Sequence, residues 1–471
     1  MALTIPQRFI IALFSAGALL LPFISCLSTE QEVKPDGNTE ETTRTEQVLV
    51  SGTEPSSEIK TSSGNGQTSE IELNSKSEAS STELSSTELS SELKLNSEPD
   101  PTRFNDGTPI VTSKTLYDGK DSILFTFAGD IMAHTPNFSR GHYDKIYEDI
   151  ESLLKESEFA FANLETPVDD DRPYSNYPNF NVQHPYADAA INAGFNVFSL
   201  ANNHTNDQGL QGIRATKKYF DGVMESTAES ERPVYASGLK ASPEDPFSIC
   251  YIEEKGWRIL FLAMTEILNT PNYSSYINYI RTSKAARAEF IKQIGDWREQ
   301  YPCELFVLSL HCAEPEYILT IDKTQAQFYH DLLDAGVDIL WANHPHVAKD
   351  WEVLVDEDSV PRKLIFYAMG NSISGQRTNP SFNAPGTARD YTGDGYMAQL
   401  RYIRDEQGIH IAHINPVLIT TYINPDRLYL IRRLDENFIT ELREAGRSTW
   451  ATYLEARKKL MERIKGKTVW Q

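Results

Sequence analysis

The sequence predicts an α/β protein whose polar side chains gather where buried strands end. Between residues 115 and 424, short apolar runs typical of buried strands alternate with segments of helical spacing. Several of these runs stop at Asp, Glu, Asn or His residues, and in open α/β sheets ligands bind beyond the carboxyl ends of the strands. The densest case is residues 195–212, FNVFSLANNHTNDQGLQG, in which an apolar run stops at Asn202, Asn203 and His204 before a helical segment.

The chain is longer than one core requires, and it is strongly acidic. It has 471 residues, whereas a single core serves about 250 to 300 residues, so we expect one large domain with appendages. The net charge of −23 argues against nucleic acid as a partner, because a phosphate backbone attracts a basic face. The cysteines, Cys26, Cys250, Cys303 and Cys312, lack the spacing of a structural zinc site and are too few for a disulfide framework. Cys312 is expected to be a small buried residue.

Residues 1–26 have the layout of a secretory signal peptide. Arg8 precedes an apolar run over residues 9–21, and small residues precede Cys26. Ser25 followed by Cys26 resembles a bacterial lipoprotein cleavage site, at which the cysteine would be lipidated and become the mature amino terminus. The alternatives are an ordinary cleaved signal and an uncleaved anchor. We therefore expect an exported, membrane-anchored lipoprotein, either periplasmic or at the cell surface.

Residues 27–114 are expected to form a disordered tether. The tract is rich in Ser, Thr and Glu, carries near-repeats such as SSTELSSTELSSEL and has almost no aromatic residues. It cannot bury enough apolar surface to offset the entropy that a chain loses on folding. Because an acidic chain repels itself and extends, the tract would hold the following domain away from a membrane surface.

The expected globular domain, residues 115–424, contains alternating strands and helices. Continuous apolar runs indicate buried strands, at residues 122–128, 159–162, 195–200, 257–266, 304–310, 337–342, 353–355 and 363–369. Helical spacing of apolar residues predicts helices, at residues 143–156, 186–193, 283–301 and 324–335. Residues 374–395 are rich in Gly, Pro and Asn and are expected to form a long loop near the site.

Two further patterns close the chain. The sequence after Tyr396 alternates like paired antiparallel strands around residues 406–408. Residues 425–471 are expected to be a helical extension, because residues 435–467 have a charged helical pattern in which basic residues gather late. A solvated helix packed on the domain is favoured over a helix at a membrane surface.

Oxygen and nitrogen donors follow five of the expected strands. They are Asp130, Glu165, Asn203 with His204, His311, and His344 with His346. Such donors suit Mn, Fe or Zn and need no thiolate. Two ions about 3.5 to 4 Å apart require a bridging carboxylate, terminal ligands and a water that can attack phosphorus, while a nearby histidine protonates the leaving oxygen.

Each of these residues also has an ordinary structural explanation. A single Asp after a strand is often a turn residue or a helix cap, and a lone Asn is often a turn former. A lone His is often a hydrogen-bonded surface residue. Five coincidences at strand ends favour a metal site instead. The spacing of His344 and His346 supports this, because residues two apart in an extended segment point the same way.

Six motifs of this kind resemble those of one known family. They are GDIM at residues 129–132, NLE at 163–165, SLANNHTNDQGLQG at 199–212, HCAEPEY at 311–317, NHPHV at 343–347 and YAMGN at 367–371. Together they resemble the CapA family of poly-γ-glutamate capsule synthesis proteins, which belongs to the calcineurin-like metallophosphatase superfamily. The resemblance covers residues 122–415, and the most specific part is ANNH followed by DxGxxG.

The resemblance implies a four-layer α/β/β/α sandwich with a two-metal centre at one edge. Asp130 and His346 would lie on one ion, Glu165 would bridge, and His204 would be the acid that donates to the leaving group. Asn203, His311 and His344 would lie on the other ion. Met132 stands where the wider superfamily has a second histidine, so the first ion lacks a ligand unless His134 or water supplies one. Residues expected to contact the substrate or to surround the ligands are His134, Asn163, Asn202, Asp207, Glu314, Glu316 and Asn371.

The resemblance also implies a role in the synthesis, export or anchoring of an anionic surface polymer such as poly-γ-glutamate. The site would be that of a metal-dependent hydrolase acting on a phosphoester. The alternative is a metal-containing binding or assembly component without catalysis, since glutamyl carboxylates could bind the ions directly. A third class is a structural surface lipoprotein that binds no metal. The expected partners are the anionic polymer or phosphoester, the membrane through the lipid anchor, and capsule-synthesis membrane proteins.

Overall fold

The computed structural model describes residues 120–464 and 466–470. The described residues belong to one compact unit. The expected signal peptide with Cys26 and the expected tether lie outside the described residues. No helix in the described part of the chain has both the length and the apolar character that crossing a bilayer requires.

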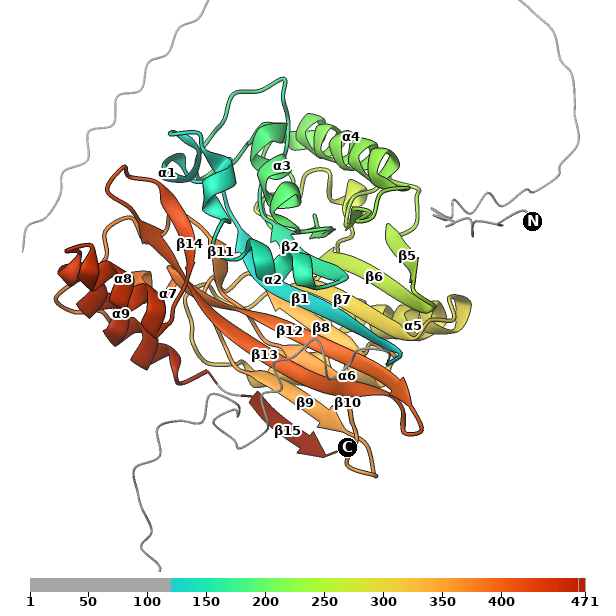
Figure 1. Cartoon of the computed structure of the whole chain (residues 1–471). Coiled ribbons are helices and arrows are strands. Elements are labelled where there is room, and N and C mark those ends of the chain that lie inside the picture. Colours follow the sequence, from blue (N-terminus) through green and yellow to red (C-terminus); the bar gives the residue numbers. More distant parts are fainter. Residues whose placement is uncertain (1–119, 465, 471) are drawn as a thin grey trace, which may run out of the picture. The chain divides into compact units, whose positions relative to one another are not determined.

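Two β-sheets form the centre of the fold (Figure 1). The first sheet has the strand order β14-β13-β12-β1-β2-β3-β4, with β11 paired to β1. Its strands are β1 (Ser122–Ile131), β2 (Phe159–Leu164), β3 (Val197–Ser199), β4 (Tyr235–Ser237), β11 (Asn371–Ile373), β12 (Asp394–Asp405), β13 (Gly408–Ile423) and β14 (Tyr429–Arg433). The second sheet has the order β15-β9-β10-β8-β7-β6-β5. Its strands are β5 (Ile249–Glu254), β6 (Trp257–Thr265), β7 (Leu305–His311), β8 (Ile339–Asn343), β9 (Trp351–Val355), β10 (Pro361–Phe366) and β15 (Gly466–Trp470).

Helices cover the outer sides of the two sheets (Figure 1). The outer layer on the first sheet consists of α2 (Glu151–Glu156), α3 (His184–Ala193) and α4 (Gly209–Thr227). The outer layer on the second sheet consists of α5 (Lys284–Gln300) and α6 (Lys323–Asp334). The shorter or later helices are α1 (Thr135–Phe138), η2 (Tyr143–Ile146), η3 (Ser274–Tyr276), α7 (Ala388–Tyr391), α8 (Glu436–Glu444) and α9 (Ser448–Met461). The expected four-layer α/β/β/α architecture is therefore confirmed.

The sequence of β6 explains how a central strand serves two layers. Successive side chains of a strand point to opposite faces. Ile259 and Phe261 pack into the core between the sheets, whereas Leu260 and Leu262 pack in the second core beneath α5 and α6. Because both faces are covered, the strand reads as a continuous apolar run and not as an alternating one.

Aromatic rings fill the space between the sheets. Phe127 of β1 stacks on Phe161 of β2 with 4.4 Å between ring centroids. From the other sheet, Phe366 and Trp341 pack on Phe127 at 5.4 and 5.8 Å between ring centroids. Large aromatic side chains bury much apolar area, so this cluster contributes strongly to holding the sheets together.

Side-chain caps begin the two helices of the second outer layer. The Ser283 hydroxyl accepts a hydrogen bond from the amide of Ala286 at the start of α5. Asp322 accepts hydrogen bonds from the amides of Thr324 and Gln325 at the start of α6. Such caps satisfy amides that have no partner within the helix, and both helices begin within one residue of where the sequence pattern predicts them.

Two expected elements differ in the structure. The single helix predicted over residues 143–156 is wrong, because the segment divides into η2 and α2 with a turn between them. The segment from residue 425 onward is not purely helical. It contains α8 and α9, but β14 pairs with β13 in the first sheet and β15 pairs with β9 in the second. β14 forms a hairpin with β13, the strand directly before it, whereas β15 pairs with a strand that lies far from it in the chain.

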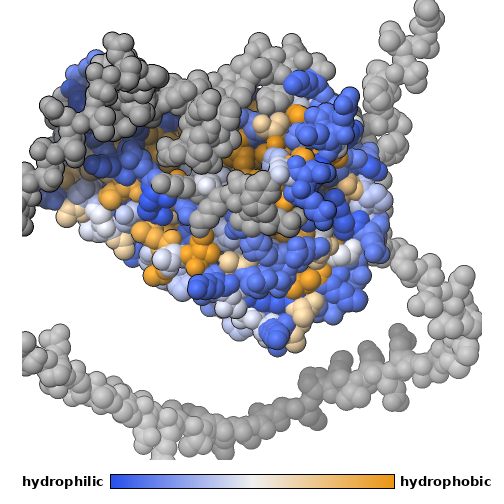
Figure 2. Space-filling model, turned by 90° about the horizontal axis from the view of Figure 1, so that it is seen from below, coloured by the Kyte–Doolittle hydropathy of each residue, from blue (hydrophilic) through white to orange (hydrophobic). Residues whose placement is uncertain are grey.

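One face of the molecule mixes polar and apolar residues. Figure 2 shows hydrophobic residues lying among hydrophilic ones on the coloured part of this face. Much of a folded protein's surface is apolar, so scattered apolar residues there identify no binding site by themselves.

Parallel pairing brings the polar residues at the strand ends to one edge of the structure. In the first sheet, β1 and β2 are parallel and Asp130 is in register with Asn163. In the second, β7 and β8 are parallel and His311 is in register with Asn343. A buried hydrogen bond of 2.9 Å between the hydroxyls of Ser199 and Ser309 joins the two sheets near this edge.

The glycine of the GDIM motif allows a close approach of two backbone segments. A Cβ at Gly129 would lie 1.8 Å from the carbonyl oxygen of Gly370. The neighbouring Asp130 amide donates a 3.0 Å hydrogen bond to that same oxygen. Gly129 therefore lets β1 lie against the turn before β11, and this contact fixes the backbone that carries Asp130.

We expect Gly129→Ala to lower the free energy of unfolding by about 1 to 3 kcal/mol, because the added methyl group overpacks a backbone contact. Gly222→Ala in α4 is the matched control, since a Cβ there meets nothing within 4 Å and alanine favours a helix by about 1 kcal/mol over glycine. Urea unfolding of both variants measures the difference. Equal stabilities for the two variants would contradict the close contact.

Candidate metal centre

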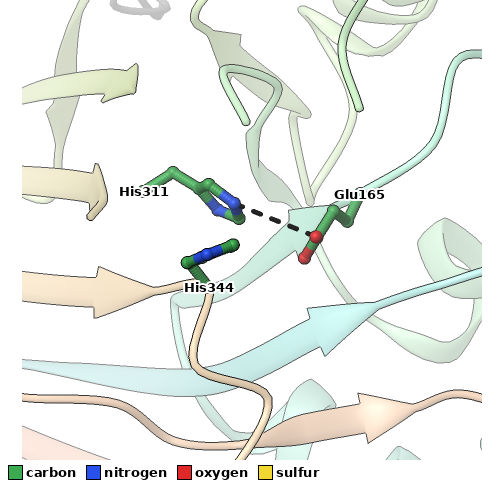
Figure 3. Close-up of side chains that lie close together, drawn as sticks. All are labelled: Glu165, His311 and His344. Carbon is green, nitrogen blue, oxygen red and sulfur yellow. Dashed lines mark ion pairs between the residues drawn. The ribbon is translucent and has the colours of Figure 1, made fainter. Parts of the chain in front are cut away.

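Side chains from both sheets converge at this shared edge. Glu165 directly follows β2, His311 is the last residue of β7, and His344 directly follows β8. Figure 3 shows the two imidazole rings and the carboxylate pointing toward one another. All three side chains are buried. The residues are far apart in the sequence, so the topology of the two sheets brings them together.

Two overlapping groups of these side chains have the spacing of metal ligands. One consists of Asp130, Glu165 and His346, and the other of Glu165, His311 and His344. Within each group the donor atoms lie within 4.8 Å of one another. Glu165 belongs to both groups, which is the arrangement that a carboxylate shared by two ions requires.

The carboxylate of Glu165 has one oxygen without a hydrogen bond. Its Oε1 is buried and accepts no hydrogen bond from any described residue. This oxygen lies 3.8 Å from His311 Nε2 and 3.7 Å from His346 Nε2. The other oxygen, Oε2, accepts a 3.3 Å hydrogen bond from the Asn163 amide. A buried, unpartnered carboxylate oxygen is costly, and a cation between it and the imidazoles would satisfy it.

The surroundings shift the pKa values of these groups in opposite directions. Burial, followed by the negative charge of Asp130, raises the pKa of the Glu165 carboxyl well above its ordinary value. Burial and the neighbouring histidines lower the pKa of both His311 and His344 well below the ordinary value. Both imidazoles are therefore neutral at pH 7, which is the form that binds metal.

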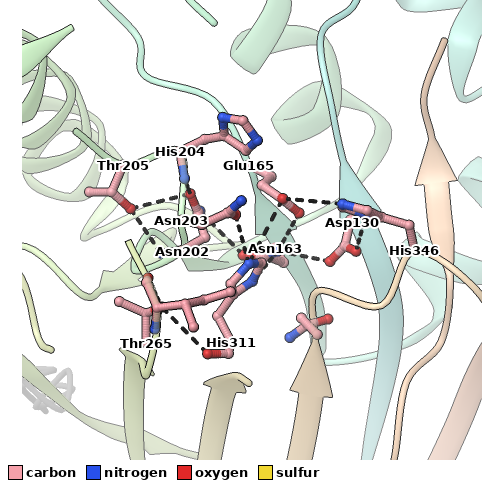
Figure 4. Close-up of polar contacts among 12 residues, drawn as sticks. Asp130, Asn163, Glu165, Asn202, Asn203, His204, Thr205, Thr265, His311 and His346 are labelled. Carbon is pink, nitrogen blue, oxygen red and sulfur yellow. Dashed lines mark hydrogen bonds and ion pairs between the residues drawn. The ribbon is translucent and has the colours of Figure 1, made fainter. Parts of the chain in front are cut away.

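A second set of contacts orients His346 (Figure 4). Its Nδ1 lies 3.0 Å from Asp130 Oδ2 and 3.1 Å from Asn371 Oδ1. The Asn163 amide donates a 2.8 Å hydrogen bond to Asp130 Oδ1. These contacts hold the ring so that Nε2 faces Glu165. Partners of this kind fix the tautomer and the orientation of a ligating histidine.

The backbone around the two late histidines is not extended, so that expectation is wrong. β8 ends at Asn343, and both His344 (φ 104°) and His346 (φ 56°) have positive φ angles. Few residues other than glycine adopt such angles, and they tend to occur at functional sites where the surrounding structure enforces them. The two rings nevertheless lie close together, with 5.7 Å between their centroids, because a turn places both at the site.

The ANNH motif reaches the cluster beside His311. Asn203 Oδ1 lies 2.9 Å from His311 Nε2. The preceding Asn202 donates a 2.8 Å hydrogen bond to the Leu164 carbonyl and accepts one from the His204 amide. Asn202 therefore links the motif to Leu164, the last residue of β2, which directly precedes Glu165.

His204 is held by an acidic residue three positions later. Its Nδ1 lies 2.6 Å from Asp207 Oδ2, and the same carboxylate oxygen accepts a 2.8 Å hydrogen bond from the Phe180 amide. The ring of Phe180 packs edge-on against the imidazole at 4.6 Å between centroids. With Nδ1 donating to Asp207, Nε2 remains as the atom that could exchange a proton with a ligand.

Of the three remaining expected site residues, Glu316, Glu314 and His134, only Glu316 lies among the candidate metal ligands. Glu316 joins His344 and His346 in a third group with metal-ligand spacing. Glu314 instead forms a buried 2.5 Å ion pair with Lys349. Within residues 120–464, His134 joins no such group. Its Nδ1 accepts a 3.1 Å hydrogen bond from the Gly375 amide, and burial lowers its pKa to about 3.

Three neighbours of the cluster were not expected from the sequence. Asn269 contacts both His204 Nδ1 (3.1 Å) and the Asn203 amide (3.2 Å). It lies just after the strand predicted at residues 257–266, and this position could have identified it as a candidate site residue. The Tyr317 ring lies near the His346 ring, and the guanidinium of Arg389 lies over the Tyr317 ring. Tyr317 ends the HCAEPEY motif and Arg389 lies in the loop expected near the site, but no spacing singles out either residue. Cys312 is buried, as expected.

Comparisons with known proteins identify a family and relatives. The family model described as bacterial capsule synthesis protein PGA_cap matches residues 124–376. The capsule biosynthesis protein CapA of Bacillus anthracis is 26% identical over 322 residues, which cover 66% of this chain and 72% of that protein. The PGA biosynthesis protein CapA of Bacillus subtilis (strain 168) is 26% identical over 276 residues, which cover 57% of this chain and 67% of that protein.

Among solved structures, the chain is similar to calcineurin-like phosphoesterase YfkN of Bacillus subtilis. The match has 12% identity and a TM-score of 0.36, and it covers 71% of this chain and 99% of that chain. A phosphatase of Mycoplasma pneumoniae matches with 12% identity and a TM-score of 0.39 over 65% of this chain and 96% of that chain.

We expect Glu165→Gln to raise the free energy of unfolding of the metal-free protein by about 1 to 3 kcal/mol. At pH 7, above the pKa of a glutamate in the unfolded chain, the raised pKa of Glu165 costs folding free energy, and glutamine removes that cost. Urea unfolding with excess chelator measures the effect.

Glu314→Gln is the matched control, because Glu314 is also buried but its charge is paired with Lys349. That variant should lose about 3 to 5 kcal/mol, since it leaves a buried lysine unpaired. A loss of stability in the metal-free Glu165→Gln protein would contradict the interpretation of Oε1.

Proposed function

This chain belongs to the bacterial capsule synthesis protein PGA_cap family, and we propose that its strand-end cluster binds two divalent metal ions. The ions would be Mn, Fe or Zn. The protein would act in the synthesis, export or anchoring of an anionic surface polymer such as poly-γ-glutamate, through metal-dependent hydrolysis of a phosphoester. The expected resemblance to CapA proteins is confirmed by the family match and by the two named relatives.

The observation that carries this proposal is the Oε1 atom of Glu165. It is buried, receives no hydrogen bond from the described residues and faces imidazole nitrogens of His311 and His346. Replacing water by such surroundings is unfavourable for a carboxylate unless a cation or a proton compensates. A pair of cations would satisfy this oxygen and the neutral histidines together.

The proposed ligand sets follow the two groups of donors. Asp130 and His346 would hold one ion, and Asn203, His311 and His344 the other, with Glu165 shared between them. Carboxylate, amide and imidazole donors suit Mn, Fe or Zn. Bound divalent ions would polarise a water molecule and a phosphoryl oxygen. Glu316 could add a ligand at the partly exposed side of the cluster.

His204 would serve as the general acid. Asp207 holds Nδ1 at 2.6 Å, which fixes the tautomer that leaves Nε2 for the leaving group. Phe180 restricts the ring by packing against it. Tyr177, which is 66% exposed, lies outside this pair with 6.4 Å between its ring centroid and that of His204. These contacts support the proposal, because they would keep the proton donor in one orientation.

We also propose that the protein is exported and anchored through a lipid on Cys26, with membrane proteins of capsule synthesis as partners. The support is the signal-like segment and the Ser-Cys dipeptide in the sequence. Both lie outside the described residues. Membrane fractionation of cells that carry Cys26→Ala tests this proposal, because the variant should leave the membrane fraction. Unchanged membrane retention would contradict the lipid anchor.

Metal binding tests the proposed centre. Protein dialysed against Mn²⁺ should hold about two ions per chain, and bound ions should raise the temperature of thermal unfolding. Glu165→Gln should weaken both sites, because Glu165 is shared. Glu352→Gln is the control, since this buried carboxylate pairs with His330 and Tyr367 away from the cluster. Elemental analysis that finds no metal in the wild-type protein would rule out the centre.

The same metal-loaded samples test hydrolysis. A phosphodiester and a phosphomonoester should be hydrolysed only when metal is present. His204→Ala should lower kcat by about 10²- to 10⁴-fold without loss of bound metal. Bound metal with no turnover, together with metal-dependent retention of poly-γ-glutamate, would contradict hydrolysis and support a binding role instead.

A further inference from the structure

An exposed arginine lies over Tyr317, a neighbour of His346, and is not used by the proposed chemistry. Arg389 belongs to the short helix α7, within the long loop that precedes β12. Its side chain is exposed. Among the described residues, no carboxylate forms an ion pair with its guanidinium, in contrast to Arg377 and Arg457 nearby, which both pair with Asp394. The charge of Arg389 is therefore available to a ligand.

An aromatic ring positions this guanidinium next to the cluster. The Cζ atom of Arg389 lies 4.8 Å from the ring centroid of Tyr317, and the Tyr317 ring lies 6.2 Å from the His346 ring, centroid to centroid. A guanidinium stacks favourably on an aromatic face and keeps its edge free to donate hydrogen bonds. One ring thus separates Arg389 from a proposed metal ligand.

Tyr317 is itself fixed by the loops of the site. Its amide donates a 2.9 Å hydrogen bond to the carbonyl of Pro345, the residue between the two late histidines. Its φ of 65° lies in the left-handed region, which a tyrosine adopts only when its surroundings enforce it. The Gln376 amide donates to the Tyr317 hydroxyl at 3.4 Å and accepts from Asn371 at 2.9 Å.

The helix that carries Arg389 is held by a buried polar network. Asp390 is fully buried and accepts hydrogen bonds from the Tyr453 hydroxyl at 2.5 Å and the Thr387 hydroxyl at 2.6 Å. Tyr453 lies on α9, so the carboxyl-terminal helix supports α7. A residue held in this way loses little further freedom when it binds a ligand, which favours affinity.

We propose that Arg389 binds an anionic group of the substrate, a carboxylate or a phosphate, next to the group that reaches the metal cluster. This inference rests on the proposed function. An arginine fork binds either oxyanion through paired hydrogen bonds. A polymer that carries a negative charge on every unit presents such a second group, so Arg389 would favour a polyanion over a substrate with a single charge.

The charges around the cluster explain why such a residue is needed. Asp130, Glu165 and Glu316 are acidic residues within or beside the cluster. An anionic polymer would be repelled by this surface, except where cations face it. The proposed ions would attract the reacting group, and Arg389 would attract the neighbouring one.

The test measures the binding of three probes to the full chain, with and without Mn²⁺, by isothermal titration calorimetry. They are a γ-linked glutamate oligomer, a short inorganic polyphosphate and a phosphodiester with a single negative charge. Arg389→Ala should weaken the binding of at least one polyanion about tenfold or more, as expected for a charge-assisted hydrogen bond, and leave the single-charge phosphodiester unchanged. Arg389→Lys should fall between the wild type and Arg389→Ala, because it keeps the charge but not the fork.

Arg404→Ala is the matched control. Arg404 also stacks on an aromatic ring, with its Cζ 4.7 Å from the Trp257 ring, but it lies beside Asp121 at the opposite end of β1. This variant should bind all three probes as the wild type does. Weakening only with the glutamate oligomer assigns a carboxylate to Arg389, and weakening only with polyphosphate assigns a phosphate.

Two outcomes would overturn the role of Arg389. One is unchanged binding of both polyanions by Arg389→Ala, and the other is an equal loss for the single-charge phosphodiester. The metal content of each sample keeps the two proposals apart. Protein that binds no metal but loses polyanion affinity in Arg389→Ala would refute the metal centre and retain the anion site. If the protein binds metal but Arg389→Ala has no effect, the anion site is refuted and the metal centre is retained.

Discussion

The carboxylate of Glu165 and the imidazoles around it impose the main constraint on this fold. A carboxylate from the first sheet faces two histidines from the second, and none of these groups has water to solvate it fully. Their convergence requires that parallel strands of both sheets end at the same edge, since each group sits at or just after a strand's carboxyl end. The cluster can therefore form only if the two sheets pack with these strand ends side by side.

Close backbone contacts and buried hydrogen bonds keep that edge in register. Gly129 lies against Gly370 with no room for a side chain, and the Ser199 and Ser309 hydroxyls join the sheets. Behind the site, Asp394 pairs with Arg377 and Arg457 in the interior. These interactions lie outside the cluster, yet they limit how far its donors can move. Rigid placement of this kind is what a site with several ligands requires.

Local sequence patterns were sufficient to predict much of the fold and to name most of the side chains that gather in the candidate cluster. Apolar runs located the central strands because strands covered on both faces need apolar residues throughout. Polar residues after those runs located the candidate ligands, because parallel strands must end on the same side. The predictions that failed depended on backbone details or distant partners. His344 and His346 have positive φ angles, and no glycine next to them in the sequence indicates such a backbone conformation. β15 pairs with β9, which lies far from it in the chain.

The sequence alone determined which residues end the central strands and what their donor atoms can bind, since hydrophobic periodicity and side-chain chemistry are local properties. It also determined the family, because the motifs occur together in one order. Only the tertiary structure decided how closely the donors gather around Glu165 and that Glu314 is paired with Lys349. It alone placed Arg389 over Tyr317 at the edge of the cluster. Distances between residues far apart in the chain depend on how two sheets pack, and no local pattern encodes that packing.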